Sequence, residues 1–202
     1  MAVPCPGCGR QYDVTLFEFG RTLWCTCGSR VGREARARRL DASEGARFIA
    51  DAMLGRLARW LRLLGFDCAW EAHIPDERLV RRGVEERRLI LSRDRALADE
   101  WRVSDIHLLQ AEKVRDQLVE VLRRFDLAPD IRVLTRCSEC NEPLAPLPAA
   151  QAAERVPARV LERQRRFSGC PACARVYWEG THTDRIKRFV DGIVAEASGA
   201  PG

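Results

Sequence analysis

The sequence predicts an α/β fold with a parallel β-sheet, and the patterns that predict it lie between residues 47 and 97. Short apolar runs at 48–50 and 89–91 have the length and composition of buried strands. Between them, an amphipathic pattern over 53–64 predicts a helix, and residues 66–70 predict a further strand. Strands that alternate with helices in this way are joined by right-handed crossovers, so a parallel sheet is expected.

The elements of this region have recognisable ends. Gly65 follows the first helix at the place where glycine commonly ends one. Asp76, just after a loop-breaking proline, is expected to cap a second helix that runs to about residue 86. Further along, residues 103–109 predict another strand, and the apolar positions of 114–125 predict another amphipathic helix.

Three aspartates occupy the ends of these elements. Asp51 ends the first apolar run, Asp94 follows the run at 89–91, and Asp76 opens the helix just beyond a strand. The carboxyl ends of parallel strands share one edge of a sheet, where open α/β folds bind ligands. Clustered carboxylates repel one another unless a cation neutralises them, so the sequence predicts a site for Mg²⁺ or Mn²⁺.

These residues carry a resemblance to a known family. It rests on FIADAMLGRLARWLRLLGFD, PDERLV and LILSRDRAL, followed by CSEC, CPAC and VYWEGTH. In this order the motifs resemble the Mut-seven C-terminal RNase domain family, a branch of the PIN-like nucleases, over about residues 47–195. The resemblance implies a PIN-like three-layer α/β/α domain and a metal-dependent ribonuclease that hydrolyses RNA phosphodiester bonds. By motif it implies a catalytic acidic site formed by Asp51, Asp76 and Asp94, with Asp99 as the nearest candidate for a fourth acid.

Eight of the nine cysteines fall into close pairs, which predict two small zinc ribbons flanking the α/β domain. Close pairs in a reducing compartment favour zinc over disulfides. The first ribbon would use Cys5, Cys8, Cys25 and Cys27, with a labile thiol pair or a disulfide as the alternative. The second would use Cys137, Cys140, Cys170 and Cys173, in two C-x₂-C motifs. A site filled by four thiolates has no open coordination position, so the metal is expected to be structural. The ninth, Cys68, is expected to be a small buried residue.

Motif order gives the expected organisation of the 202 residues. We expect an N-terminal zinc ribbon at 1–32, an arginine-rich linker at 33–46, a PIN-like nuclease domain at 47–130, and a C-terminal zinc ribbon with a closing helix at 131–197. The apolar stripe of that helix is expected to pack on the nuclease domain rather than to form a dimer contact. No run of 18 apolar residues and no apolar leader is present, so a cytoplasmic protein without a membrane partner is expected.

Basic and aromatic residues are the candidates for RNA contact. The formal net charge of +5 at pH 7 mildly favours a polyanionic partner. Arg56 and Arg93 are candidate phosphate clamps. Trp178 and His182 would either stack on unpaired bases or fasten the second ribbon to the nuclease domain. The arginines of the first helix lie opposite its apolar stripe, as is typical of a solvated face: Arg56, Arg59 and Arg62.

Two other functions fit parts of the sequence. One is a non-catalytic RNA- or ribosome-associated zinc-ribbon binding protein, and the other is an adaptor whose ribbons bind protein. Bare carboxylates repel phosphate, so the three aspartates favour the enzyme. Within the enzyme, the N-terminal ribbon and its linker are expected to supply affinity for RNA, and the acidic site to supply the chemistry. The sequence leaves open the RNA substrate, endo- or exonucleolytic action, the number of catalytic metals and the oligomeric state.

Overall fold

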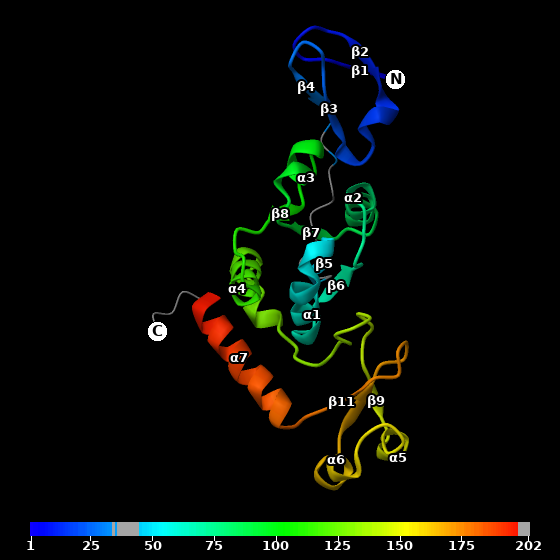
Figure 1. Cartoon of the computed structure of the whole chain (residues 1–202), viewed down its shortest axis with the longest axis vertical. Coiled ribbons are helices and arrows are strands. Elements are labelled where there is room, and N and C mark those ends of the chain that lie inside the picture. The colour runs from blue at the N-terminus through cyan, green and yellow to red at the C-terminus, as the bar shows by residue number, and fades with distance from the viewer. Residues whose placement is uncertain (34, 36–44, 198–202) are drawn as a thin grey trace. The chain divides into compact units, whose positions relative to one another are not determined.

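The computed structural model describes residues 1–33, 35 and 45–197, without the side chains of residues 181 and 182. Most of the expected linker at 33–46 therefore lies outside the described residues. Packing divides the chain into two compact units. Figure 1 labels the helices and strands along the chain. The first unit consists of residues 1–55 and 69–110, and the second of residues 56–68 and the chain from 111 onward.

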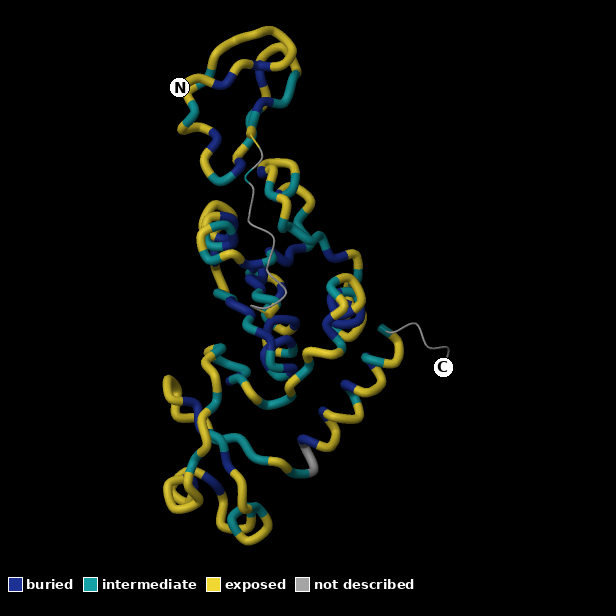
Figure 2. The backbone as a smooth tube through the Cα atoms, turned by 180° about the vertical axis from the view of Figure 1, so that it is seen from behind, coloured by how far each residue is buried: buried dark blue, intermediate teal, exposed yellow. Residues whose placement is uncertain are grey.

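A four-stranded sheet in the order β6-β5-β7-β8 forms the centre of the α/β part. Its strands are β5 (Arg47–Ala50), β6 (Asp67–Trp70), β7 (Leu89–Ser92) and β8 (Ile106–Leu108). Ile49 pairs with Ile90, and Leu91 with His107, both in parallel. Strands β5 and β7 are buried along most of their length, whereas only the middle of β6 is buried and β8 is half-buried throughout; Figure 2 colours the backbone by this burial. The predicted α/β class with a parallel sheet is confirmed.

Helices follow the strands as the alternating pattern predicts. They are α1 (Gly55–Leu63), preceded by the turn η3 (Ala52–Leu54), and then α2 (Asp76–Glu85), α3 (Arg95–Glu100) and α4 (Val114–Phe125). Within the first unit, α2 packs on β5 and β7, and α3 packs on β8. Gly65 follows α1 with φ +98°, and a Cβ there would meet the carbonyl oxygen of Arg132 at 2.5 Å. Glycine is therefore required at this turn.

Two sequence expectations need correction. Asp76 is the first residue of α2 rather than its cap, because extended Pro75 occupies the N-cap position and makes no side-chain capping bond. The strand expected at 103–109 is shorter, because the residues before β8 pair elsewhere. Trp101 bridges Arg21 and Val103 bridges Ala35, so this segment pairs with the N-terminal part of the chain.

The N-terminal ribbon consists of two hairpins joined by a kinked helical segment. The hairpins pair β1 (Ala2–Pro4) with β2 (Gln11–Asp13), and β3 (Thr22–Trp24) with β4 (Arg30–Gly32). The segment between them is η1 (Val14–Gly20). Val3, Phe17 and Val31 form a small buried cluster together with two cysteines. Such a small core contributes little to stability, which is why a bound metal is expected to support it.

The second unit contains the C-terminal ribbon and a helical layer. The ribbon is an antiparallel sheet of β9 (Ala145–Leu147), β10 (Phe167–Gly169) and β11 (Val176–Trp178), with the short helices α5 (Ala149–Ala152) and α6 (Ala158–Arg163). The closing helix α7 (Thr181–Ala197) packs on α4. The rings of Trp60 and Phe189 lie 4.5 Å apart between centroids. The stripe of α7 therefore packs on helices of the expected nuclease domain.

Arg62 corrects the expected solvated face of α1. Its side chain is buried, and it donates hydrogen bonds to the carbonyl oxygens of Cys68 at 2.8 Å and Glu139 at 2.5 Å. Arg56 and Arg59 are exposed as expected, and Arg59 forms an ion pair with Glu139. The buried arginine thus joins α1 to β6 and to the first cysteine pair of the C-terminal ribbon. Cys68 itself is fully buried, as expected.

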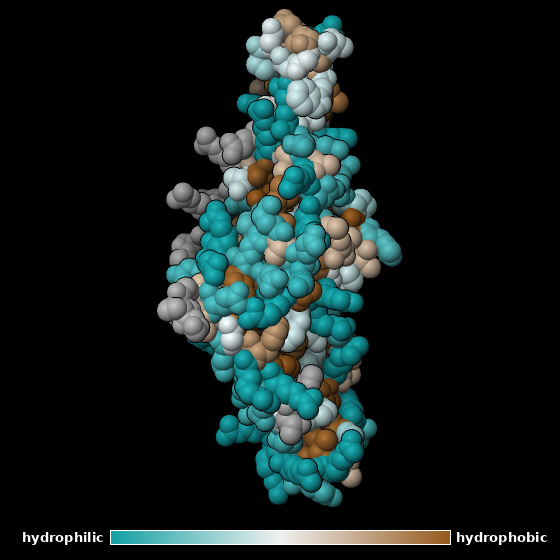
Figure 3. Space-filling model, turned by 60° about the vertical axis from the view of Figure 1, so that its left-hand side comes forward, coloured by the Kyte–Doolittle hydropathy of each residue, from teal (hydrophilic) through white to brown (hydrophobic). Residues whose placement is uncertain are grey.

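The described residues include no helix that is long and apolar enough to cross a membrane. In the space-filling view of Figure 3, hydrophilic side chains cover most of the visible face, and apolar side chains occur among them in small groups.

Candidate active site and metal centres

Asp51 and Ser92 meet at the carboxyl edge of the sheet. Asp51 directly follows β5 and is only 8% exposed, while Ser92 ends the neighbouring strand β7 and is fully buried. The Ser92 hydroxyl donates a hydrogen bond to Asp51 Oδ2 at 2.5 Å. The backbone N–H of Asp51 donates to the carbonyl oxygen of Leu91 at 2.9 Å. The carboxylate of Asp51 is thus held in a fixed position where the strands end.

Asp94 is fixed by the same serine. Its backbone N–H donates to Ser92 Oγ at 2.9 Å, and its Oδ1 accepts from the backbone N–H of Ala96 at 2.8 Å. The second bond makes Asp94 the N-cap of α3. Ser92 therefore links the two aspartates that the sequence placed at this edge.

Asp76 shares the electrostatic field of these residues. It is exposed on the first turn of α2. Its pKa is raised above 3.8, first by partial loss of solvent and then by the negative charges of Asp51, Asp94 and Glu100. Ser92 thus holds Asp51 and Asp94 at one edge of the sheet, and the charges of these two residues and of Glu100 act on Asp76.

Glu100 was missed from the sequence, which offered Asp99 as the nearest fourth acid. Both residues lie in the last turn of α3. The backbone carbonyls of both residues accept a hydrogen bond from Thr22, and Glu100 is the residue of the two whose charge raises the pKa of Asp76. If Asp94 had been recognised as a helix cap, residues 95–100 would have been assigned to a helix. Asp99 and Glu100, as neighbours in that helix, would then have been expected to point in different directions. The role of Asp99 stays a prediction.

The donor set fits a hard divalent cation, because it consists of carboxylate oxygens. One oxygen each of Asp51 and Asp94 bonds within the protein, which leaves the second oxygen of each for a ligand. Over the described part of the chain, only cysteine groups bring three or more metal-binding atoms within 4.8 Å of one another. The carboxylate oxygens of the acidic residues are thus spaced more widely than the sulfurs of the cysteine groups.

The first cysteine group lies between the hairpins of the N-terminal ribbon. The Sγ atoms of Cys5 and Cys27 are 3.5 Å apart, and those of Cys8 and Cys25 are 3.6 Å apart. The backbone N–H of Cys27 and then the hydroxyl of Tyr12 lower the pKa of Cys25 to about 5. All four sulfurs lie within 4.8 Å of one another, so the group can hold one metal ion.

The second cysteine group lies in the C-terminal ribbon. The Sγ atoms of Cys137 and Cys173 are 3.6 Å apart, and those of Cys140 and Cys170 are 3.2 Å apart. Tyr177 bonds to Cys137 Sγ at 3.1 Å and accepts from the backbone N–H of Ser138. Burial and then the bond to Cys137 raise the pKa of Tyr177 to about 12. The phenol thus has a structural partner, and this group can also hold one metal ion.

The four residues expected to contact RNA lie in different settings. Arg56 is exposed on α1, and Arg93 is half-buried between Ser92 and Asp94. Trp178 is half-buried and packs on the apolar cluster of the C-terminal ribbon around Phe167. The side chain of His182 lies outside the described residues. Packing thus gives Trp178 a role in the ribbon core, and contact with RNA stays a prediction.

Comparison with known proteins identifies the family. A family model of the Mut7-C RNAse domain matches residues 46–190. No curated protein and no solved structure matches the chain. The matched segment contains the three aspartates and the second cysteine group and excludes the N-terminal ribbon. It supports a nuclease with RNA as its substrate. Because the match spans most of the 202 residues, the chain belongs to the Mut7-C RNAse domain family.

Proposed function

We propose that this protein is a PIN-like ribonuclease that depends on Mg²⁺ or Mn²⁺ and hydrolyses RNA phosphodiester bonds. The observation that carries the proposal is that one buried serine, Ser92, bonds both Asp51 and Asp94 at the carboxyl edge of the sheet. The charges of these two aspartates and of Glu100 also raise the pKa of Asp76. Concentrated negative charge of this kind is unfavourable unless a cation binds there. Membership of an RNase domain family supports the same conclusion.

Asp51, Asp76 and Asp94 would hold the cation, with Glu100 as the fourth carboxylate. When bound, such an ion makes a coordinated water a better nucleophile and stabilises charge on phosphate oxygens. The Ser92 hydroxyl would keep Asp51 oriented, and the backbone N–H of Ala96 would keep Asp94 oriented. Carboxylates held in this way would act without rearrangement during the reaction.

The reaction proposed is hydrolysis. The oxygen of water forms a bond to phosphorus, the bond from phosphorus to the leaving ester oxygen breaks, and a proton from water ends on that oxygen. Arg56 and Arg93 are proposed to contact phosphate, and neither is required for the proton transfer.

Both cysteine groups are proposed to bind zinc. Four thiolates in a small ribbon are the usual ligands of structural zinc and leave no coordination position for substrate. The two ions would therefore stabilise the ribbons and take no part in hydrolysis. The catalytic ion would occupy the separate set of oxygen donors.

The experiment that tests the function is cleavage of single-stranded RNA with Mg²⁺, with Mn²⁺ and with a chelator. Asp51→Asn and Asp94→Asn each remove one charge without removing volume, and Asp130→Asn removes an exposed charge elsewhere. We expect the first two variants to lose cleavage by about a hundredfold or more, because each removes a ligand of the cation. Asp130→Asn should cleave as well as the unaltered protein.

Two results would contradict the proposed ribonuclease activity. Cleavage that persists unchanged in both purified site variants would point to a contaminant or to another site. RNA binding without any cleavage in either metal would favour the non-catalytic RNA-binding alternative.

A further inference from the structure

The N-terminal ribbon caps the helix that carries Glu100. The hydroxyl of Thr22 lies 3.1 Å from the carbonyl oxygen of Asp99 and 2.9 Å from that of Glu100. Arg30 donates to the carbonyl oxygen of Ala98 at 3.2 Å and also to that of Asp99. The last carbonyls of a helix have no partner within the helix, so the ribbon supplies the hydrogen bonds that α3 lacks.

Backbone pairing strengthens this junction. The N–H of Arg102 donates to the carbonyl oxygen of Gly20 at 2.7 Å, and the N–H of Ala35 donates to the carbonyl oxygen of Arg102 at 2.9 Å. Gly20 has φ +82°, and a Cβ there would meet the carbonyl oxygen of Arg102 at 2.5 Å. The close approach therefore requires glycine. The ribbon and the acidic residues belong to the same compact unit.

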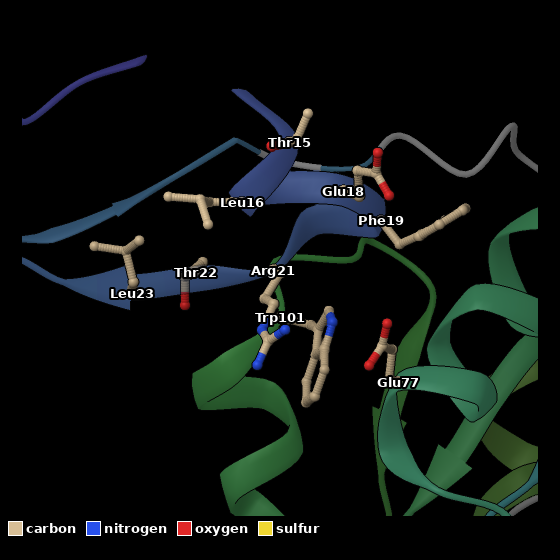
Figure 4. Close-up of a pocket in the computed structure, with 9 residues that line it drawn as sticks. All are labelled: Thr15, Leu16, Glu18, Phe19, Arg21, Thr22, Leu23, Glu77 and Trp101. Carbon is tan, nitrogen blue, oxygen red and sulfur yellow. The ribbon is translucent and has the colours of Figure 1, made fainter. Parts of the chain in front are cut away.

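A cavity of about 380 Å³ lies at this junction, and Figure 4 shows the residues that line it. On the ribbon side these include Glu18, Phe19 and Arg21, and on the other side they are Glu77 and Trp101. The last two are the sequence neighbours of Asp76 and Glu100, whose charges interact. The cavity is therefore lined by the residues next in sequence to two of the four acids.

The lining of the cavity combines three kinds of group. The Arg21 side chain extends from the ribbon toward the indole of Trp101 in Figure 4, and it forms no ion pair with any described residue. Glu18 and Glu77 add two carboxylates, and their charges contribute, after Glu85, to the raised pKa of Arg81. Phe19 adds an apolar side chain that packs against the core cluster around Trp101, and the Arg81 guanidinium lies over its ring, 5.5 Å from the centroid.

A ligand that matches this lining has an anionic group, N–H donors and a flat apolar face. Inorganic phosphate offers only the first, and two carboxylates disfavour it. A nucleotide offers all three, and a volume near 380 Å³ lies within the range of small-molecule sites. A paired base would hide both its N–H groups and its faces, so the nucleotide must be unpaired.

We propose that this cavity binds one unpaired nucleotide of the RNA, adjacent to the scissile phosphate. Arg21 binds a phosphate oxygen, Glu77 accepts a hydrogen bond from an N–H group of the base, and the base lies against the apolar lining beside Phe19. The nature of the ligand rests on the proposed ribonuclease function. The N-terminal ribbon, which lies outside the segment matched by the family, thereby forms part of the substrate site and selects single-stranded RNA.

Binding can be measured independently of cleavage in full-length Asp51→Asn protein, by fluorescence anisotropy with a labelled single-stranded RNA and with its duplex. The single strand should bind more tightly than the duplex. Arg21→Ala should weaken single-strand binding on the order of tenfold, the usual effect of losing a charge-assisted hydrogen bond to phosphate. Arg10→Ala removes the same charge from an exposed ribbon site outside the cavity and should change the dissociation constant less than about twofold.

A variant that fills the cavity tests whether binding needs the space in the cavity as well as the charge of Arg21. Leu16 is 48% exposed at the cavity, so Leu16→Trp should fill part of it without disturbing the core and should also weaken binding of the single strand. Equal loss in Arg10→Ala and Arg21→Ala, or unchanged binding in Leu16→Trp, would overturn the proposal and leave only general attraction between the basic chain and RNA. Binding that depends on Arg21 in a protein that never cleaves would retain this site and reject the ribonuclease.

Discussion

The Ser92 hydroxyl donates a hydrogen bond of 2.5 Å to Asp51 Oδ2, although the two residues end different strands of the sheet. The same oxygen accepts the backbone N–H of Asp94 at 2.9 Å. One buried hydroxyl therefore orients both aspartates that the sequence placed at the carboxyl edge. Their orientation depends on a residue that holds no cation in the proposed site.

Ser92→Ala should lower kcat by about tenfold or more, because a positioned carboxylate loses the donor that fixes it. The KM for RNA should change little, since Ser92 is fully buried and does not contact substrate. Steady-state kinetics across a titration of Mg²⁺ would measure both effects, with Ser168→Ala in the C-terminal ribbon as the control. An unchanged kcat would show that Asp51 keeps its position without this bond.

Asp76→Asn should raise the thermal stability of metal-free protein at neutral pH. A raised pKa means that the folded state binds the proton of Asp76 more tightly than the unfolded state does. The contribution of Asp76 to stability is thus fully present below its ordinary pKa of 3.8 and is lost as pH rises through the higher folded value. Melting temperatures across pH would show a gain for the variant at neutral pH that disappears below 3.8. A gain of equal size at all pH values would exclude this cause.

The parallel sheet could be predicted from the sequence because β5 and β7 are short apolar runs and the amphipathic patterns of α1 and α2 lie between them. Helix α3 could not be predicted, because Arg95–Glu100 is too short to show a helical period. The early part of 103–109 was expected to form a strand, yet Val103 instead bridges Ala35. Pairing of segments so distant in sequence leaves no local pattern.

The acidic site, too, could be derived from the sequence only in part. Asp51 and Asp94 follow apolar runs, so their shared edge follows from the topology of parallel strands. Ser92 and Glu100 carry no such signal, because their importance lies in contacts across the fold. Arg62 was predicted to be solvent-exposed because it lies opposite the apolar stripe of its helix. It is buried instead, and it bonds to Glu139 of the C-terminal ribbon.

Arg62→Met should lower the free energy of unfolding by about 2–4 kcal/mol, because buried carbonyl groups lose a charged donor. The groups affected belong to Cys68 and Glu139. Arg59→Met is the matched control, since Arg59 lies on the same helix and pairs with Glu139, but its side chain is 58% exposed. Its loss should cost less than about 1 kcal/mol. Urea denaturation of both variants would measure the difference, and similar values would mean that the bonds of Arg62 contribute no more than a surface ion pair.

Protein purified without added zinc should contain two zinc ions per chain, one for each group of four cysteines. Cys8→Ser should reduce the content to one ion and leave the C-terminal site filled, and Cys140→Ser should have the reverse effect. Elemental analysis of the purified variants would measure this. A total near one in the unaltered protein would remove one of the proposed sites, and the two variants would show which.

The sequence led us to expect that the N-terminal ribbon supplies affinity for RNA and leaves turnover unaffected. The caps that Thr22 and Arg30 provide for α3 change this expectation, because Glu100 lies in the capped turn. Thr22→Val keeps the shape of the side chain and removes its hydroxyl, so it should destabilise the protein by about 1 kcal/mol.

The combined variant with Arg30→Met should also lower kcat at saturating RNA, since Glu100 would lose its fixed position. Arg10→Met removes an exposed ribbon arginine that does not contact α3, and it should leave kcat unchanged. Kinetics at saturating RNA distinguish the two roles of the ribbon, because loss of affinity alone raises KM without lowering kcat. Unchanged turnover in a folded Thr22→Val, Arg30→Met protein would restore the simpler division, in which the ribbon only holds RNA near the acidic site.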